Sequence, residues 1–266
     1  MIGFTDFPDA PRLTLKGLTA PGWLLNREES LAPVDLTIEG GRIVSGPPGE
    51  VVEMRGAMVL PAFVDLHTHL DKGHIWPRSP NPDGTFFGAL ETVAADRAAR
   101  WSAEDVRARA GFALRSAYAH GTRAIRTHLD SIPPQDEISW PVFRELRAEW
   151  AGRIALQAAC LVAVDNVSED GPFRRTADIV AESGGVLGCV TYPIDGLRER
   201  LRAFFRMAEA RGLSADFHVD ETLDPGSATL RVIAETALET GFSAPIVVGH
   251  CCSLSTQAAA EAGRTL

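Results

Sequence analysis

The chain has 266 residues, of which 45% are apolar, and a formal net charge of −9. This length suffices for one large domain, or for one domain with a small companion, and the acidic balance argues against a nucleic-acid-binding surface. No stretch approaches the ~18 apolar residues of a membrane span, and the N-terminus has neither the basic nor the apolar region of a signal peptide.

The cysteines offer no thiol chemistry of the usual kinds. They are Cys160, Cys189, Cys251 and Cys252, all in apolar surroundings and without a C-x-x-C pair. A thiol zinc site or a redox motif is therefore not expected. Free buried thiols suit a reducing compartment, so we expect a cytoplasmic protein.

The first part of the chain, residues 1–57, is rich in turns and predicts a small β-domain. The segment 35–44 alternates apolar and polar residues around Gly40 and Gly41, which is typical of a β-hairpin. The segment 51–61 continues this part as a further strand.

From Pro61 onward, apolar strands alternate with amphipathic helices. We expect strands at 58–67, 123–128, 153–161, 184–193, 215–219 and 245–250. We expect helices at 102–120, with Ser102 as N-cap, and at 137–150, 173–183, 195–212 and 227–240. A glycine follows each helix, namely Gly121, Gly152, Gly184, Gly212 and Gly241. This alternation predicts an α/β domain over 58–266, either a doubly wound sheet or a TIM barrel. No glycine-rich phosphate loop follows the first strand, which disfavours dinucleotide binding.

Five of the seven histidines stand at or just past the carboxyl ends of these strands: His67, His69, His128, His218 and His250. His-x-His at a strand end places two imidazoles on one face, because side chains alternate with period two. Imidazole is the commonest ligand of zinc and iron, and an open site needs about three protein ligands plus water. This pattern predicts a metal site on His67, His69 and His218.

Other polar residues near these strand ends have two interpretations each. Glu221 could act as acid or base on the bound water or the leaving group, or it could be a solvated loop carboxylate. For His128 we favour a structural or supporting role over direct metal ligation. Trp76, together with Phe86 and Phe87 on the long loop after the first strand, could close over a substrate, although ordinary loop packing explains them too.

The motif set resembles the amidohydrolase superfamily. The residues concerned are PAFVDLHTHLDK (61–72), the strand end HVDE (218–221) and GHCCSLS (249–255), and the resemblance runs from about Asp35 to Leu266. Within that superfamily the chain is similar to the cytosine deaminase branch, which includes the enzymes that remove isopropylamine from N-isopropylammelide.

The resemblance implies a TIM-like barrel with a β-sandwich formed from both chain ends. It also implies that His67, His69 and His218 are metal ligands, that Glu221 shuttles a proton and that His250 orients the attacking water. The implied cofactor is one divalent ion, Zn(II) or Fe(II). Two-metal members bridge their ions with a lysine at the end of the fourth strand, but Lys16 and Lys72 lie elsewhere, which favours one ion.

Two departures from the family pattern matter. The family's fourth ligand is an aspartate that ends the eighth strand, and only about six strands precede Leu266. We therefore expect a barrel that is incomplete in this chain, as in a fragment or one piece of a split enzyme. Cytosine deaminases also carry a glutamine after the third strand, where this chain has Asp165. A carboxylate only accepts hydrogen bonds, so a donor-rich ring is expected in place of cytosine.

These observations predict a metal-dependent hydrolase of C–N bonds in a small nitrogen heterocycle, with a cytosine deaminase-like aminohydrolase as the leading hypothesis. An enzyme that releases an alkylamine from a triazine uses the same residues and is the alternative. A hypothesis of another class is a non-catalytic truncated homologue. We expect no nucleic-acid or membrane partner, and a homo-oligomer is left open.

Overall fold

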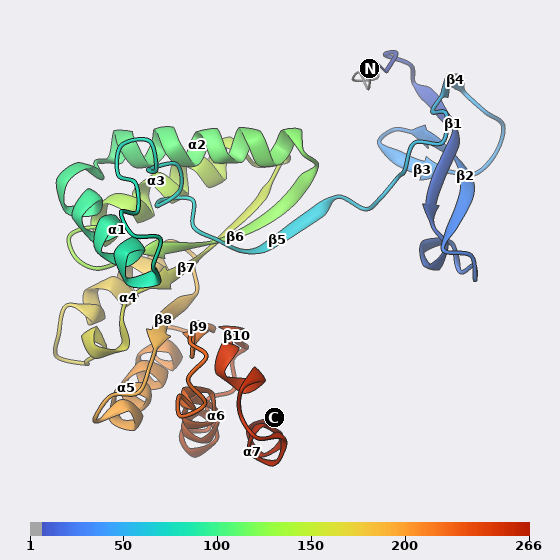
Figure 1. Ribbon diagram of the computed structural model, residues 1–266. Helices are drawn as coiled ribbons and strands as arrows, with labels where there is room; N and C mark the ends of the chain where they lie inside the picture. Colours follow the sequence, from blue (N-terminus) through green and yellow to red (C-terminus); the bar gives the residue numbers. More distant parts are fainter. Residues whose placement is uncertain (1–6) are drawn as a thin grey trace. The chain divides into compact units, whose positions relative to one another are not determined.

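The computed structural model describes residues 7–266, which form two compact units. One unit ends at Ala62, and the other comprises Phe63–Leu266 (Figure 1). None of the helices described over this range is both long enough and apolar enough to cross a bilayer.

The N-terminal unit contains one four-stranded sheet in the order β3-β2-β1-β4. Its elements are β1 (Arg12–Pro21), the 3-10 helix η1 (Gly22–Leu25), β2 (Leu31–Glu39), β3 (Arg42–Val44) and β4 (Glu50–Glu53). The predicted hairpin is confirmed: β2 and β3 are antiparallel, with Glu39 opposite Arg42. Gly40 and Gly41 join them with φ of 57° and 73°, a left-handed conformation that glycine adopts without steric cost. β1 is an addition, because the sequence analysis assigned no strand to it.

The second unit contains six parallel strands. They are β5 (Phe63–Thr68), β6 (Thr122–Asp130), β7 (Ala155–Leu161), β8 (Leu187–Thr191), β9 (Ala215–Val219) and β10 (Ile246–His250). β5-β6-β7 form one ladder and β8-β9-β10 another. Parallel bridges from Ala159 to Val186 and from Ala163 to Val190 connect the two ladders. The six strands therefore follow one another in chain order, and all their carboxyl ends lie at one edge.

Helices connect these strands. They are α1 (Phe86–Arg100), α2 (Ala103–Ala119), α3 (Asp136–Glu149), α4 (Phe173–Glu182), α5 (Leu197–Glu209), α6 (Thr229–Thr240) and α7 (Ala259–Thr265), with the 3-10 helices η2 (Val164–Asn166) and η3 (Cys252–Ser255). From α2 onward, each α-helix contacts the next one (Figure 1). The predicted cap of α2 is confirmed, because the Ser102 side chain accepts a hydrogen bond from Asp105 N. The five glycines that follow helices all have positive φ.

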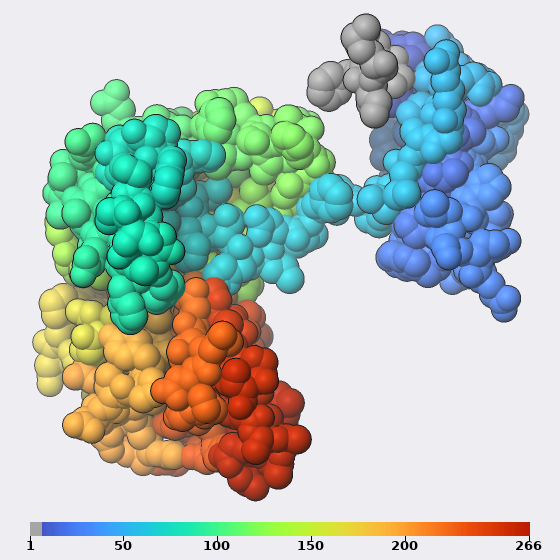
Figure 2. All heavy atoms as spheres, viewed as in Figure 1, coloured from blue at the N-terminus to red at the C-terminus, as the bar shows by residue number. Residues whose placement is uncertain are grey.

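The helix α1 was not predicted. Phe86 and Phe87 were assigned to a loop, but they form the first turn of α1, where the Thr85 side chain caps Gly88 N. Both phenylalanines are exposed. Figure 2 shows the β5–α1 segment, in teal, at the surface of this unit.

The core of the second unit lies between the middle strands and the helices. β9 is buried along its whole length, and Phe217 packs against Phe204 and Phe205 of α5. The two outer strands differ from it, because β5 exposes Val64 and Leu66, and β10 is also largely exposed. The carboxyl ends of the buried strands are therefore held by packing against the helices.

Candidate metal centre

Parallel pairing brings the predicted histidines together at one edge. His67 lies in β5 and His69 follows its last residue, while His128, His218 and His250 lie in β6, β9 and β10. β9 and β10 are in register with Gly249 beside His218 and His250 beside Val219. Since all these strands are parallel, their ends meet on the same side of the sheet.

Four imidazoles form a compact cluster. His67, His69, His128 and His218 each offer a ring nitrogen, and these atoms all lie within 4.8 Å of one another. The His67 ring centroid is 5.3 Å from that of His69, 4.5 Å from that of His218 and 4.2 Å from that of His128. The three predicted ligands are therefore adjacent, and His128 joins them.

Several nitrogens of this cluster are buried without a hydrogen-bond partner among residues 7–266. They are Nε2 of His67, Nδ1 of His69, Nδ1 of His128 and both ring nitrogens of His218. Buried polar atoms in native proteins are nearly always paired, so an unpaired group of this size indicates a ligand. A divalent ion such as Zn(II) or Fe(II) accepts several imidazole nitrogens at once, and the donor set fits it.

Burial keeps the rings of His67, His69 and His218 neutral. Burial, helped by the neighbouring imidazoles His128 and His250, lowers the pKa of His67 to about 4. Burial, with Lys72 and His128, lowers the pKa of His69 to about 3, and burial also holds the pKa of His218 far below its usual value. Neutral imidazole is the form that binds a metal, because its lone pair is free.

His128 has a second contact that orients it. Its Nε2 lies 3.0 Å from Oδ1 of Asp216, and the other oxygen of Asp216 accepts a hydrogen bond from Arg126 at 3.1 Å. An ionised Asp216 favours the tautomer with the proton on Nε2, which leaves a lone pair on Nδ1 facing the cluster. With this geometry His128 could bind the metal itself or could support the residues that bind it.

Glu221 and His250 form a pair beside the cluster. Nδ1 of His250 lies 3.6 Å from Oε1 of Glu221, and its ring centroid is 4.9 Å from those of His67 and His218. The strand ends here are turned sharply, with positive φ at Asp220 and His250. Such backbone persists only where the surroundings enforce it.

Asp220 enforces that turn after β9. Its carboxylate accepts hydrogen bonds from Ser227 Oγ at 2.6 Å, Thr229 N at 3.1 Å and Leu230 N at 3.2 Å, at the start of α6. These hydrogen bonds therefore attach Asp220, the residue before Glu221, to the N-terminus of α6. No feature of the sequence analysis had singled out Asp220.

The two predicted substrate contacts have different surroundings. Asp165 lies in η2 and accepts a hydrogen bond from the Tyr192 hydroxyl at 3.1 Å. Ala163 pairs with Val190 and Val190 with His218, so Asp165 and Tyr192 stand just beyond the level of the cluster. Trp76 is 63% exposed, and none of the described contacts joins it to the histidines.

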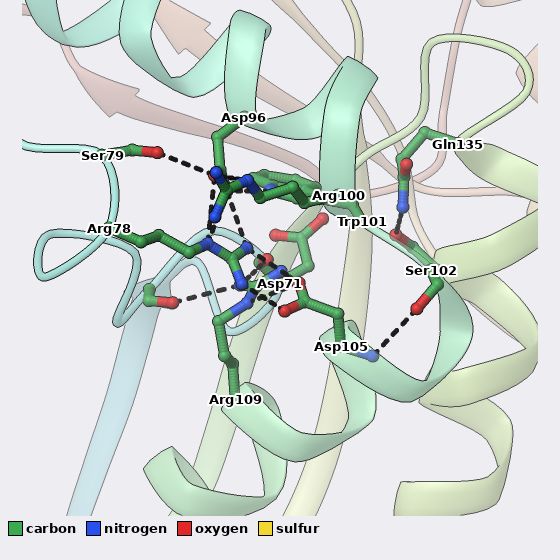
Figure 3. Close-up of polar contacts among 12 residues, drawn as sticks. Asp71, Arg78, Ser79, Asp96, Arg100, Trp101, Ser102, Asp105, Arg109 and Gln135 are labelled. Carbon is green, nitrogen blue, oxygen red and sulfur yellow. Dashed lines mark hydrogen bonds and ion pairs between the residues drawn. The ribbon is translucent and has the colours of Figure 1, made fainter.

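A network of ion pairs holds the segment between β5 and α1 (Figure 3). Arg78 donates to Asp96 at 2.7 Å and also binds Asp105, which in turn accepts from Arg109 at 2.7 Å. Arg109 also donates to the carbonyl oxygens of Asp71 and Gly73, which follow the His-x-His motif. Sequence reasoning missed this network, because its members are spaced irregularly along the chain.

A second ion pair lies closer to the cluster. Asp130 ends β6 and binds both Lys72 and Arg97 at 2.6 Å. Its backbone N–H donates to Oδ2 of the buried Asp71 at 2.8 Å. Burial, followed by the charge of Asp130, raises the pKa of Asp71 to about 7. The residues just after His69 are thereby fixed to the end of β6.

Comparison with known proteins identifies the family of this arrangement. Residues 50–158 match Amidohydro_3, described as an amidohydrolase family. A pterin deaminase of Rhizobium rhizogenes is 46% identical over 96% of this chain and 61% of the relative. The N-isopropylammelide isopropyl amidohydrolase of a Pseudomonas species is 22% identical over 81% of this chain and 57% of the relative.

Solved structures agree with the sequence relatives. A 5-methylcytosine deaminase from Klebsiella pneumoniae has a TM-score of 0.74 at 23% identity, over 95% of this chain and 62% of that chain. An N-isopropylammelide isopropylaminohydrolase from Burkholderia multivorans has a TM-score of 0.71 at 25% identity, over 96% of this chain and 64% of that chain.

The chain thus spans less than two thirds of each of these proteins. Its α/β fold resembles that of the barrel-shaped amidohydrolases, as the sequence predicted. The matched family, the relative at 46% identity and the structural neighbours lead to one assignment. The chain belongs to the amidohydrolase superfamily.

Proposed function

We propose that the protein is a metal-dependent hydrolase that removes an amino group from a small nitrogen heterocycle. The observation that supports this most is the convergence of unpartnered ring nitrogens from His67, His69 and His218 beside the pair Glu221–His250. A ligand set and a proton-transferring pair at one edge are the parts that hydrolytic deamination requires.

The metal ligands in this proposal are His67, His69 and His218. One Zn(II) or Fe(II) ion bound there would lower the pKa of a water towards neutrality. Asp216 keeps His128 in one tautomer, and we assign His128 the supporting role that the sequence favoured.

We also propose that the strands form a barrel, which is closed between β10 and β5 by strands from outside these 266 residues. One of those strands would bring the aspartate ligand of the family. The exposed apolar side chains of β5 and β10 support this closure.

In this proposal two residues, His250 and Glu221, transfer protons. His250 orients the attacking water and accepts its proton while the water oxygen forms a bond to the ring carbon that bears the amino group. Glu221 passes this proton from His250 to the adjacent ring nitrogen. It then carries the proton of the new hydroxyl group to the departing amine, so that the C–N bond breaks with release of ammonia. Their separation of 3.6 Å allows the two side chains to act on one water.

We propose an amino-substituted pteridine as substrate, since the relative at 46% identity is a pterin deaminase. Asp165 supports a ring with a hydrogen-bond donor at its edge, because an ionised carboxylate can only accept. The Tyr192 hydroxyl occupies one oxygen of that carboxylate and leaves the other for a ring N–H. Trp76, on the anchored β5–α1 segment, would cover the ring.

Release of an alkylamine from a triazine is the second candidate. It is favoured by the likeness to two N-isopropylammelide hydrolases, at 22% and 25% identity. The same histidines and Glu221 would act, and only the leaving group differs. A third possibility of another class, a non-catalytic chain, predicts neither stoichiometric metal nor turnover.

One assay separates these candidates. The metal-loaded protein is supplied with 2-amino-4-oxopteridine, cytosine and N-isopropylammelide, and ammonia and isopropylamine are measured. We expect ammonia from the pteridine. Release of isopropylamine alone would favour the triazine enzyme, and stoichiometric metal without any turnover would contradict both.

The variant Glu221→Gln tests the assigned proton transfer. It should bind the metal as the unaltered protein does and lose about 10²- to 10⁴-fold in turnover, the usual contribution of general acid–base catalysis. Glu209→Gln, on α5, is the matched control and should keep full activity. Full activity of Glu221→Gln would show that the role is wrong.

A further inference from the structure

A cavity of about 550 Å³ lies between the end of α1 and the segment that leads from β6 to α3. Its walls include the proline pair Pro133–Pro134, with Ile132 beside them and Trp101 at the end of α1. Trp101 is almost fully buried, and its Nε1 donates to Asp96 at 2.8 Å. These walls are flat and apolar, which suits a planar organic group.

The charged groups of this cavity are of one sign. Among the described residues that line it, Arg97 and Arg100 are charged and none is acidic. The chain as a whole has a net charge of −9, so a cavity with two arginines and no carboxylate departs from its surroundings. A guanidinium group recognises carboxylate and phosphate through paired hydrogen bonds.

Arg100 is the lining arginine whose hydrogen-bond donors are largely free among the described residues. Its ion pair with Asp96 is long, at 4.0 Å, and its side chain is 56% exposed. Asp96 is already bound by Arg78 at 2.7 Å and by Ser79 at 2.8 Å, as Figure 3 shows. Arg100 therefore keeps most of its donors for a ligand.

Arg97 joins the wall of the cavity to the carboxyl end of β6. Arg97 binds Asp130 at 2.6 Å, and Lys72 binds the same carboxylate at 2.6 Å. Arg97 and Lys72 therefore share one carboxylate at the end of β6. Asp130 ends β6 only two residues after His128, which places the cavity at the edge where the histidines converge.

We infer that this cavity is a subsite for a carboxylate on a substituent of the heterocyclic substrate. Arg100 binds the carboxylate, and the apolar wall formed by Ile132 and the pair Pro133–Pro134 packs against the substituent that bears it. The inference rests on the proposed function, because it adds a carboxylate-bearing substituent to the heterocycle proposed as substrate.

Direct binding tests the subsite apart from catalysis. Calorimetry of the metal-loaded protein with benzoate and with the uncharged benzamide should show benzoate binding at least about tenfold more tightly, since a charged hydrogen bond is lost in the amide. Arg100→Gln should weaken benzoate binding at least about tenfold, and Arg115→Gln, an exposed arginine of α2, should leave it unchanged. Equal binding of the two compounds, or benzoate binding that Arg100→Gln leaves intact, would overturn the subsite.

Kinetics distinguish failure of the subsite from failure of the proposed function. With 2-amino-4-oxopteridine and its 6-carboxylate, Arg100→Gln should raise KM about tenfold for the carboxylate alone and leave kcat unchanged for both. Equal effects on the two compounds would contradict the subsite while the function stands. Absence of turnover on every heterocycle would contradict the function, and the benzoate result would still decide the subsite.

Discussion

Two polar clusters of the Phe63–Leu266 unit show opposite hydrogen bonding. In the network around Arg78, the buried Asp96 accepts from Arg78, Ser79 and Trp101. In the histidine cluster, both ring nitrogens of His218 are buried and have no partner among residues 7–266. Both clusters lie next to the carboxyl ends of the strands.

The difference separates a structural role from a functional one. A buried polar group that is satisfied within the protein stabilises the fold, whereas a group left unsatisfied costs stability unless a ligand completes it. The Arg78 network therefore fixes the β5–α1 segment, and the histidine cluster is the candidate site for an ion. Four experiments test this distinction.

The largest effect is expected for His218→Ala. This change removes a proposed ligand, so metal affinity should fall more than about 100-fold, beyond the loss caused by residues that only support ligands. Metal content by elemental analysis after dialysis measures it. His120→Ala, at the exposed end of α2, is the control and should keep its metal. Unchanged metal content in His218→Ala would contradict the assignment.

Arg78→Ala should come next, with a cost in the free energy of unfolding of about 3 kcal/mol or more. The change leaves the fully buried carboxylate of Asp96 without its charged partner. Urea unfolding followed by circular dichroism measures the loss. Arg107→Ala breaks exposed pairs with Glu145 and Glu149, and should cost less than about 1 kcal/mol. Equal costs would mean that burial does not distinguish the two networks.

Asp216→Asn should weaken metal affinity by about 10- to 100-fold and leave the fold intact. The substitution keeps the shape but removes the charge that sets the tautomer of His128. Competition with a chromophoric chelator measures the affinity. Asp178→Asn, which alters a half-exposed pair with Arg211, serves as the control. If metal affinity does not change, His128 has no part in the metal centre.

The smallest effect is a pH dependence of the Arg78 network. Burial raises the pKa of Asp96, but hydrogen bonds from Arg78, Ser79 and Trp101 outweigh it and hold the pKa at about 2. Because the folded pKa lies below the ordinary value of about 3.9, the stabilisation is complete above that pH and is lost as the pH falls towards 2. We expect a loss of about 2 kcal/mol.

The measurement compares urea midpoints of the unaltered protein and Arg78→Ala between pH 5 and pH 2, with a chelator in both samples. The gap between the two proteins should narrow as the pH falls. A gap that stays constant over this range would show that the Asp96 carboxylate is not the partner of Arg78 that stabilises the fold.

Much of the site could be predicted because its signals are local. The His-x-His motif and the histidines at later strand ends stand at fixed positions relative to apolar strands, and parallel strands bring such ends to one edge. The helix ends were predictable for the same reason, since Gly121 and Gly241 provide the left-handed residue that ends a helix. These features depend on neighbours in the sequence.

The remaining features depend on residues far apart in the chain. His128 and Asp216 are 88 positions apart in the sequence, and Arg78 and Asp96 are 18 positions apart. No local sequence pattern pairs residues at such separations. α1 is held by a contact of this kind, through Asp96. The order of strands and helices, and the positions of the histidines at the strand ends, can be read from the amino-acid sequence. Which nitrogens are left unpaired and which carboxylates are satisfied depends on the folded protein, because burial and hydrogen-bond partners are set by packing between distant segments.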